Sequence, residues 1–217
     1  MEISPAVSTR LDTARYVTSI AELAGFRTSG LAQVPEVAFA GRSNAGKSSA
    51  INALTNRTRL AYASKMPGRT QTLNFFALGN GRDPATTGHL VDLPGYGFAK
   101  VDAATRQRWN ALVGGYLVER SQLRGVVLVI DSRRGPMPAD EELIGLLCRR
   151  DPDRPVALHL LLSKVDQIKT AERRAALAAL EARARLLPLQ TTVQLFSARG
   201  REGVEALRQR VSEILSG

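Results

Sequence analysis

An eight-residue segment follows the pattern G-x-x-x-x-G-K-[ST], and it constrains the possible folds more than any other feature of the chain. The segment consists of Gly41, Arg42, Ser43, Asn44, Ala45, Gly46, Lys47 and Ser48. Its glycines allow a tight backbone in which successive N–H groups point at phosphate oxygens. Lys47 adds a point charge near the outer phosphates, and the Ser48 hydroxyl is a ligand for Mg²⁺. The pattern therefore predicts a loop that binds a nucleoside triphosphate.

The residues around this loop agree with the prediction. Residues 36–40, Glu-Val-Ala-Phe-Ala, have the character of a buried strand, and residues 49–54 are expected to form the helix that follows the loop. The alternative, an ordinary glycine-rich turn, does not require this order of strand, loop and helix.

The rest of the chain alternates between apolar strands and helical segments. We expect further strands at 73–78, 89–93, 126–131, 157–163 and 192–197, and helices at about 103–119, 139–150, 170–187 and 203–215. A short connection makes the first two of these strands an antiparallel hairpin, whereas continuously apolar strands are typical of a buried parallel sheet. The predicted fold is α/β, with a doubly wound, mostly parallel six-stranded sheet, one antiparallel strand and helices on both faces. Residues 31–217 are expected to form one domain, and residues 1–30 a partly ordered arm.

The composition excludes some classes of protein. No apolar run reaches the roughly 18 residues that a membrane-spanning helix needs, so we expect no membrane association and a cytoplasmic protein. The single Cys148 cannot form an internal disulfide and is expected to pack in the core. His89 and His159 are expected to be structural, because no Cys/His cluster resembles a zinc site.

The net charge of +10 favours a polyanionic partner, with nucleic acid as the natural candidate. The alternative is simple solvation, since the basic residues are scattered along the chain rather than gathered in one run.

A second motif, Asp92-Leu93-Pro94-Gly95, stands at the end of a predicted strand. An aspartate there holds Mg²⁺ through water, while the glycine N–H reaches the γ-phosphate. The spacing D-x-x-G alone also fits an ordinary turn. Its position downstream of the phosphate loop, at a strand end, favours the nucleotide interpretation.

Two later motifs predict which base is bound. Ser163, Lys164, Val165 and Asp166 end another strand, and the Asp166 carboxylate there accepts hydrogen bonds from N1–H and the 2-amino group of guanine. Adenine has neither donor, so a buried unpaired carboxylate rejects ATP. Lys164 is expected to lay its stem across the base. Phe196, Ser197 and Ala198 end the last strand, where the Ala198 N–H is expected to face the guanine O6.

A polar segment between the first two motifs is expected to be a switch that responds to the γ-phosphate. It contains Gly68, Arg69, Thr70, Gln71 and Thr72. A threonine in such a segment completes the Mg²⁺ coordination when the γ-phosphate is present. By chemistry alone, Thr70 and Thr72 both qualify.

Together these motifs resemble the EngB group of bacterial ribosome-assembly GTPases, an Era-like family. The resemblance rests on residues 38–49, 67–71, 92–100 and 163–166, and it covers about residues 20–215. It implies a P-loop GTPase fold, GTP or GDP as ligand, and Thr70 with Ser48 as the direct Mg²⁺ ligands. It also implies partnership with the large ribosomal subunit and ribosomal RNA, and a part in cell division and septation. Two departures are Ser163, where Thr or Asn is usual, and a 79–88 loop that looks long.

The catalytic arrangement differs from that of Ras-like proteins, which have a glutamine after D-x-x-G to orient the attacking water. This chain has Tyr96, so we expect slow intrinsic hydrolysis. Lys47, Thr70 and Asn44 are the candidate catalytic residues. Asn44 has two interpretations that stay open: it recruits K⁺ beside the transferring phosphate, or it only braces the loop.

Candidates for an arginine that acts on the phosphates within this chain are Arg69, Arg133 and Arg134, although phosphate contact or solvation is the more ordinary role for each. Competing functions are an ATP-using small-molecule kinase, an RNA-binding module without nucleotide chemistry, and a division switch that acts through proteins away from the ribosome. We expect a monomer.

Overall fold

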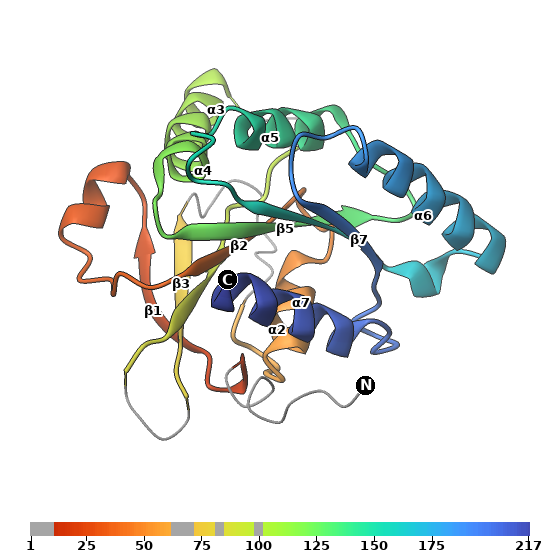
Figure 1. Ribbon diagram of the computed structural model, residues 1–217, viewed down its shortest axis with the longest axis horizontal. Helices are drawn as coiled ribbons and strands as arrows, with labels where there is room; N and C mark the ends of the chain where they lie inside the picture. The colour runs from red at the N-terminus through yellow and green to blue at the C-terminus, as the bar shows by residue number, and fades with distance from the viewer. Residues whose placement is uncertain (1–10, 62–71, 81–84, 98–101) are drawn as a thin grey trace.

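The computed structural model describes residues 11–61, 72–80, 85–97 and 102–217 (Figure 1). Within them, one sheet contains seven strands in the order β1-β3-β4-β2-β5-β6-β7. The strands are β1 (Arg15–Ile20), β2 (Glu36–Gly41), β3 (Leu73–Leu78), β4 (Gly88–Asp92), β5 (Leu123–Asp131), β6 (Ala157–Ser163) and β7 (Thr191–Leu195). Five of them, β4, β2, β5, β6 and β7, run parallel, and β3 is antiparallel to both of its neighbours.

All six predicted strands are present, and the predicted hairpin is confirmed by the antiparallel pairing of β3 with β4. The seventh strand, β1, comes from the segment that we expected to be an arm. It lies at the edge of the sheet and exposes most of its side chains, so it lacks the apolar pattern that marks the central strands. The predicted domain boundary near residue 30 stays a prediction.

Helices cover both faces of the sheet. They are η1 (Leu23–Arg27), α2 (Lys47–Leu54), α3 (Ala103–Trp109), η2 (Asn110–Gly114), α4 (Gly115–Glu119), α5 (Pro138–Cys148), η3 (Val165–Gln167), α6 (Thr170–Ala184) and α7 (Val204–Ser216). In Figure 1, α3, α4, α5 and α6 lie over one face, and α2 and α7 lie over the other. Each face has its own cluster of buried apolar side chains, as expected of a doubly wound fold.

The predicted helix at 103–119 is present as one continuous helical segment with a π-helical turn, η2, in its middle. Asp102 caps its start by accepting a 2.7 Å hydrogen bond from the Thr105 N–H. Single π-helical turns are rare in proteins, but those that occur are often found near functional sites. None of the helices in the described ranges is both long and apolar enough to cross a bilayer.

The prediction for Cys148 is wrong, because its side chain is exposed. Helix α5 buries Leu143, Ile144 and Leu147, whereas Cys148 is its last residue and is exposed where the helix ends. The two histidines are buried, and burial lowers the pKa of both His89 and His159 to about 4.

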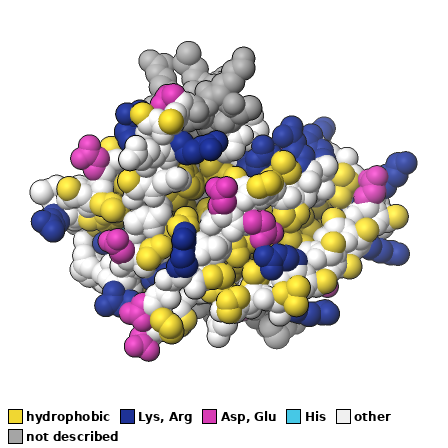
Figure 2. All heavy atoms as spheres, turned by 90° about the horizontal axis from the view of Figure 1, so that it is seen from above, with side chains coloured by type: hydrophobic (Ala, Val, Ile, Leu, Met, Phe, Trp, Pro, Cys, Tyr) yellow, Lys and Arg dark blue, Asp and Glu magenta, His cyan; other side chains and the backbone are white. Residues whose placement is uncertain are grey.

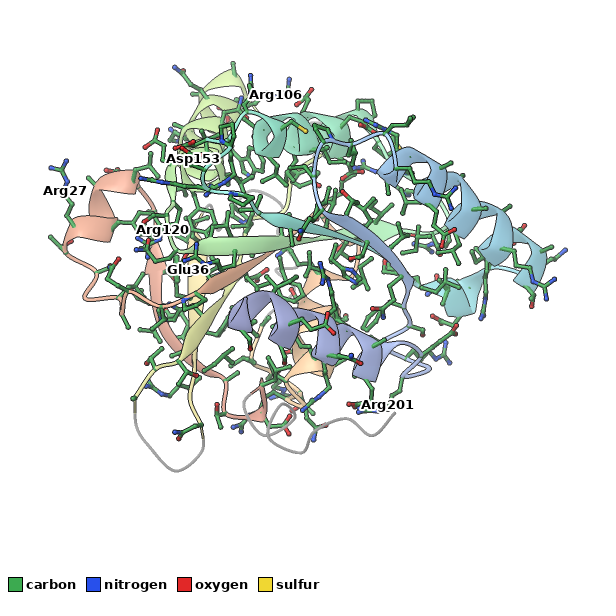
Figure 3. The ribbon with its side chains drawn as sticks, viewed as in Figure 1. Arg27, Glu36, Arg106, Arg120, Asp153 and Arg201 are labelled. Atoms are coloured by element: carbon green, nitrogen blue, oxygen red, sulfur yellow. The ribbon has the colours of Figure 1, made fainter. Side chains whose placement is uncertain are left out.

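A buried ion pair holds the amino end of β2 to the end of α4 (Figure 3). Glu36 is fully buried and accepts hydrogen bonds from the Arg120 guanidinium, the shortest at 2.6 Å, and from the Tyr116 hydroxyl at 3.0 Å. A buried carboxylate needs such partners. This cluster lies at the amino ends of the parallel strands. The motifs follow the carboxyl ends of these strands, so they lie at the opposite edge of the sheet.

Candidate nucleotide-binding site

The predicted motifs that the structure describes all follow the carboxyl ends of parallel strands. The phosphate loop follows β2, the D-x-x-G motif follows β4, the S-K-x-D motif follows β6, and residues 196–198 follow β7. The central strand β2 lies between β4 and β5, so strands that come later in the chain flank it on both sides. In open α/β sheets, ligands bind at such a switch point, outside the carboxyl edge.

Two glycines determine the shape of the phosphate loop. A Cβ at Gly41 would lie 2.7 Å from the carbonyl oxygen of Val129, so only glycine fits between β2 and β5. Gly46 has φ 103°, which side chains rarely adopt, and it caps helix α2, which begins at Lys47. The free N–H groups of that first turn favour an anion next to the loop.

Lys47 and Asp92 form an ion pair at the centre of this edge, and both side chains are largely buried. Phe39 of β2 is directly opposite Asp92 of β4, so the register brings the aspartate beside the phosphate loop. The Asp92 carboxylate and the hydroxyl of Ser48, in the first turn of α2, are hard oxygen donors. This donor set fits Mg²⁺.

The segment after Asp92 packs directly on the phosphate loop. The Leu93 N–H donates a 3.0 Å hydrogen bond to the Phe39 carbonyl, and the Ser43 N–H donates one of 3.0 Å to the Tyr96 carbonyl. A Cβ at Gly95 would lie 3.3 Å from the Ser43 nitrogen, so a larger residue would push the two loops apart. The predicted γ-phosphate contact, Gly95, thus lies against the predicted phosphate loop.

The side chain of Tyr96 points away from this edge and into the protein. Its hydroxyl donates a 2.6 Å hydrogen bond to Asp140 of α5, and its ring meets the Trp109 ring edge-on at 5.5 Å. The residue that stands where Ras-like proteins have glutamine is therefore fixed in the core and is unable to orient a water at the phosphates.

The S-K-x-D motif is tied to the phosphate loop by two side chains. The buried Ser163 hydroxyl faces the carbonyl oxygens of Ala45 and Ile130. Lys164 has φ 59° and donates from its ammonium group to the Asn44 carbonyl. The Lys164 stem therefore extends from the base motif to the phosphate loop, and its position across the base stays a prediction.

Asp166 is held by the last motif. The buried Ser197 hydroxyl donates a 2.6 Å hydrogen bond to Oδ1 of Asp166 and accepts one of 2.9 Å from the Gly200 N–H. The Val165 N–H donates to the Phe196 carbonyl at 3.3 Å. These contacts join the two predicted base-binding segments, and Ala198 continues from the second.

Asp131, at the end of β5, also belongs to the site, although no motif in the sequence predicted it. Its carboxylate accepts hydrogen bonds from the Arg133 guanidinium, at 2.5 and 2.8 Å, and from the Lys164 ammonium at 2.9 Å. The Arg133 guanidinium, followed by Lys164, holds the pKa of Asp131 well below its usual range. The sequence pattern that could have predicted this role is an aspartate at a strand end, two residues before an arginine. Both Arg133 and Arg134 are exposed, and Arg133 is engaged by Asp131.

Part of the predicted switch falls outside the described residues: Gly68, Arg69, Thr70 and Gln71. Thr72 is described, and its hydroxyl donates a 3.1 Å hydrogen bond to Asn74 at the start of β3. Asn74 is directly opposite Asp92, so Thr72 enters the sheet next to the predicted Mg²⁺ ligand.

Comparisons with known proteins agree with this geometry. Residues 36–164 match a family described as 50S ribosome-binding GTPase. A probable GTP-binding protein EngB from Paraburkholderia xenovorans is 48% identical over 79% of this chain and 78% of its own length. The corresponding protein of Thiobacillus denitrificans is 43% identical over 95% of this chain and 93% of its own.

Solved structures share the fold. The crystal structure of a probable GTP-binding protein engB superimposes with a TM-score of 0.62 and 23% identity, over 83% of this chain and 98% of that one. Aquifex aeolicus Era bound to GDP.AlF4- gives a TM-score of 0.60 with 18% identity, over 84% of this chain and 57% of that one. The P-loop GTPase fold is therefore confirmed.

Proposed function

Because the chain belongs to the EngB family of GTP-binding proteins, we propose that this GTPase is a molecular switch in the assembly of the large ribosomal subunit. The observation that carries the proposal is the match of residues 36–164 to the 50S ribosome-binding GTPases. In this proposal the protein acts as a monomer in the cytoplasm, where ribosomes assemble. In this proposal, cells need the protein for division and septation because of its role in ribosome assembly.

GTP and GDP lie along the carboxyl edge, with the phosphates at the loop 41–48 and the base at Asp166. The N–H groups of the loop and Lys47 bind the phosphates. Ser48, Thr70 and, through water, Asp92 would hold Mg²⁺, which would neutralise charge on the phosphates. The Asp166 carboxylate, oriented by Ser197, selects guanine over adenine.

Hydrolysis is slow without a partner, because no glutamine side chain follows the D-x-x-G motif and the Tyr96 hydroxyl is engaged by Asp140. Charge on the phosphates is then stabilised from outside the chain, by the ribosomal surface or by K⁺ next to Asn44.

The charge of the protein supports a ribosomal RNA partner. The net charge is +10, and Figure 2 shows Lys and Arg side chains spread over the face that α3, α4, α5 and α6 cover, with fewer Asp and Glu among them. Arg27, Arg106 and Arg201 point outward from three separate parts of the surface (Figure 3). A wide positive surface favours a large polyanion over a single small one.

Co-sedimentation with purified ribosomal subunits tests this function. The proposal expects the protein to pellet with the large subunit in the presence of a non-hydrolysable GTP analogue, and to remain in the supernatant with GDP or with the small subunit. Equal pelleting in GDP, or none in either state, would contradict the ribosomal role and favour a division switch that acts through protein partners. ATP that competes equally with GTP would instead favour a kinase.

A further inference from the structure

Tyr96 is anchored at both its backbone and its side chain. Its carbonyl oxygen accepts the 3.0 Å hydrogen bond from Ser43 of the phosphate loop, and its hydroxyl donates the 2.6 Å hydrogen bond to Asp140. Tyr96 is 7% exposed and Asp140 is 2% exposed. The residue therefore connects the phosphate loop with the first turn of α5, through a contact from which water is excluded.

Asp140 is itself held in place. Its second oxygen, Oδ2, accepts a 2.8 Å hydrogen bond from the Met137 N–H, just before Pro138 begins α5. This bond closes the cap of the helix, so the carboxylate has little freedom to move. Burial, followed by the charge of Asp140, raises the pKa of Tyr96 well above its ordinary value of 10, so its phenol remains a hydrogen-bond donor.

Pro94, which precedes Gly95, is also held by a hydrogen bond to a helix. The indole N–H of Trp109, at the end of α3, donates a 3.1 Å hydrogen bond to the Pro94 carbonyl. Trp109 also contacts the Tyr96 ring edge-on. Both neighbours of Gly95 are therefore fixed to helices that cover the same face of the sheet.

We propose that Tyr96 is a positioning residue for GTP, which holds the Gly95 N–H where the γ-phosphate binds by fixing its loop to Asp140 of α5. Trp109 is the second anchor of the same loop. The proposal rests on the predicted contact between Gly95 and the γ-phosphate, and it is independent of the ribosomal role.

Tyr96 preorganises the loop that carries Gly95. A loop that is fixed before the nucleotide arrives loses little conformational entropy when it meets the γ-phosphate. Without its anchor, the loop must be ordered by the γ-phosphate contact itself, and the affinity for GTP falls. GDP has no γ-phosphate, so its affinity does not depend on the anchor. The signature is a change in the ratio of the two affinities.

The test uses Tyr96→Phe, which removes only the hydroxyl. We expect the affinity for an imido analogue of GTP to fall about five- to tenfold, within the range that one lost intramolecular hydrogen bond gives. The affinity for GDP should stay within about twofold. Trp109→Phe should shift the ratio in the same direction. Titration of a fluorescent nucleotide measures all these affinities.

Tyr116→Phe is the matched control, because Tyr116 is also a buried tyrosine whose hydroxyl donates to a buried carboxylate, Glu36, at the opposite edge of the sheet. It should lower the unfolding temperature as Tyr96→Phe does, without changing the affinity ratio. Gly95→Ala displaces the loop itself, because its Cβ would press on Ser43, and so shows whether the position of Gly95 affects the γ-phosphate contact. If Gly95→Ala weakens GTP binding while Tyr96→Phe leaves the ratio unchanged, the positioning role is wrong. If neither variant changes the ratio, the predicted contact of Gly95 is wrong as well. An equal change in Tyr116→Phe would also overturn the proposal.

Discussion

Ser163 joins the base motif to the phosphate loop, since its buried hydroxyl lies within hydrogen-bond distance of the Ala45 carbonyl oxygen. Although Ser163 departs from the more usual Thr or Asn, its hydroxyl reaches the loop at the Ala45 carbonyl. A Cβ at Gly46 would lie 3.6 Å from the Ser163 side chain. The base site and the phosphate site are therefore one connected unit.

We expect Ser163→Ala to weaken GTP and GDP binding by similar factors, because it disconnects the loop without removing the residue that reads the base. The two carbonyl oxygens lose a buried donor, which costs about 1–3 kcal/mol of stability. The ratio of GTP to ATP affinity should not change. Nucleotide titration together with urea unfolding measures both effects, and a loss of guanine preference would show that Ser163 takes part in base selection.

Asn44 provides a test of potassium activation. Its φ of 63° lies in the left-handed region, which asparagine tolerates, and its side chain is exposed at the loop. We expect faster GTP hydrolysis in KCl than in NaCl at equal ionic strength, since a K⁺ ion held by the amide oxygen neutralises charge as an arginine would. Asn44→Ala should abolish the difference and change nucleotide affinity by no more than a few-fold.

Asn44→Gly is the better control of the two, because glycine adopts φ 63° without strain whereas alanine does not. If both variants lose the potassium effect, the loss belongs to the side chain. Equal rates of the wild-type protein in both salts would leave Asn44 as a brace of the loop.

The buried His89 predicts a dependence of stability on pH. Burial and the nearby Arg120 lower its pKa to about 4 from the ordinary 6.5. Between these values the unfolded chain binds a proton that the folded protein does not, so stability falls as the pH drops from 6.5 towards 4. The slope approaches about 1.4 kcal/mol per pH unit for this group. Urea unfolding of His89→Gln should show a shallower slope than wild type, and identical slopes would mean that His89 titrates normally.

Salt dependence tests the polyanionic partner. If several arginines neutralise phosphates, the affinity for ribosomal RNA should fall steeply with salt, by roughly 0.7 to 0.9 in the log–log slope for each contact. Arg106→Gln should reduce the slope by about one contact if α3 faces the RNA. A flat response, measured by filter binding between low and physiological salt, would leave the charge of +10 as a matter of solvation.

The sequence was sufficient for the fold and for the placement of the described motifs at the carboxyl ends of the strands, because the features that carried the prediction are local. Gly41 and Gly46 are required by the backbone itself, and β5 and β6 are recognisable because both of their faces are buried. Strand β1 was not predicted, since an exposed edge strand has no such pattern.

The side-chain contacts that hold the site together could not be predicted from the sequence. Tyr96 and Asp140 are 44 residues apart, and Asp131 and Lys164 are 33 residues apart. Only the parallel register of β5 with β6, which places Asp131 opposite Ser163, brings the second pair together. No spacing rule describes such contacts.

The most direct test of the account exchanges the base that operates the switch. Asp166→Asn should bind GTP at least about tenfold more weakly and prefer xanthosine triphosphate, because the amide offers a donor to the 2-oxo group of xanthine. We expect this variant to pellet with the large ribosomal subunit when a non-hydrolysable xanthosine analogue is present. We expect the guanosine analogue no longer to support pelleting at a concentration sufficient for wild type. Pelleting of Asp166→Asn with the guanosine analogue at wild-type concentrations would contradict the account, because Asp166 would then not be the residue through which GTP controls binding.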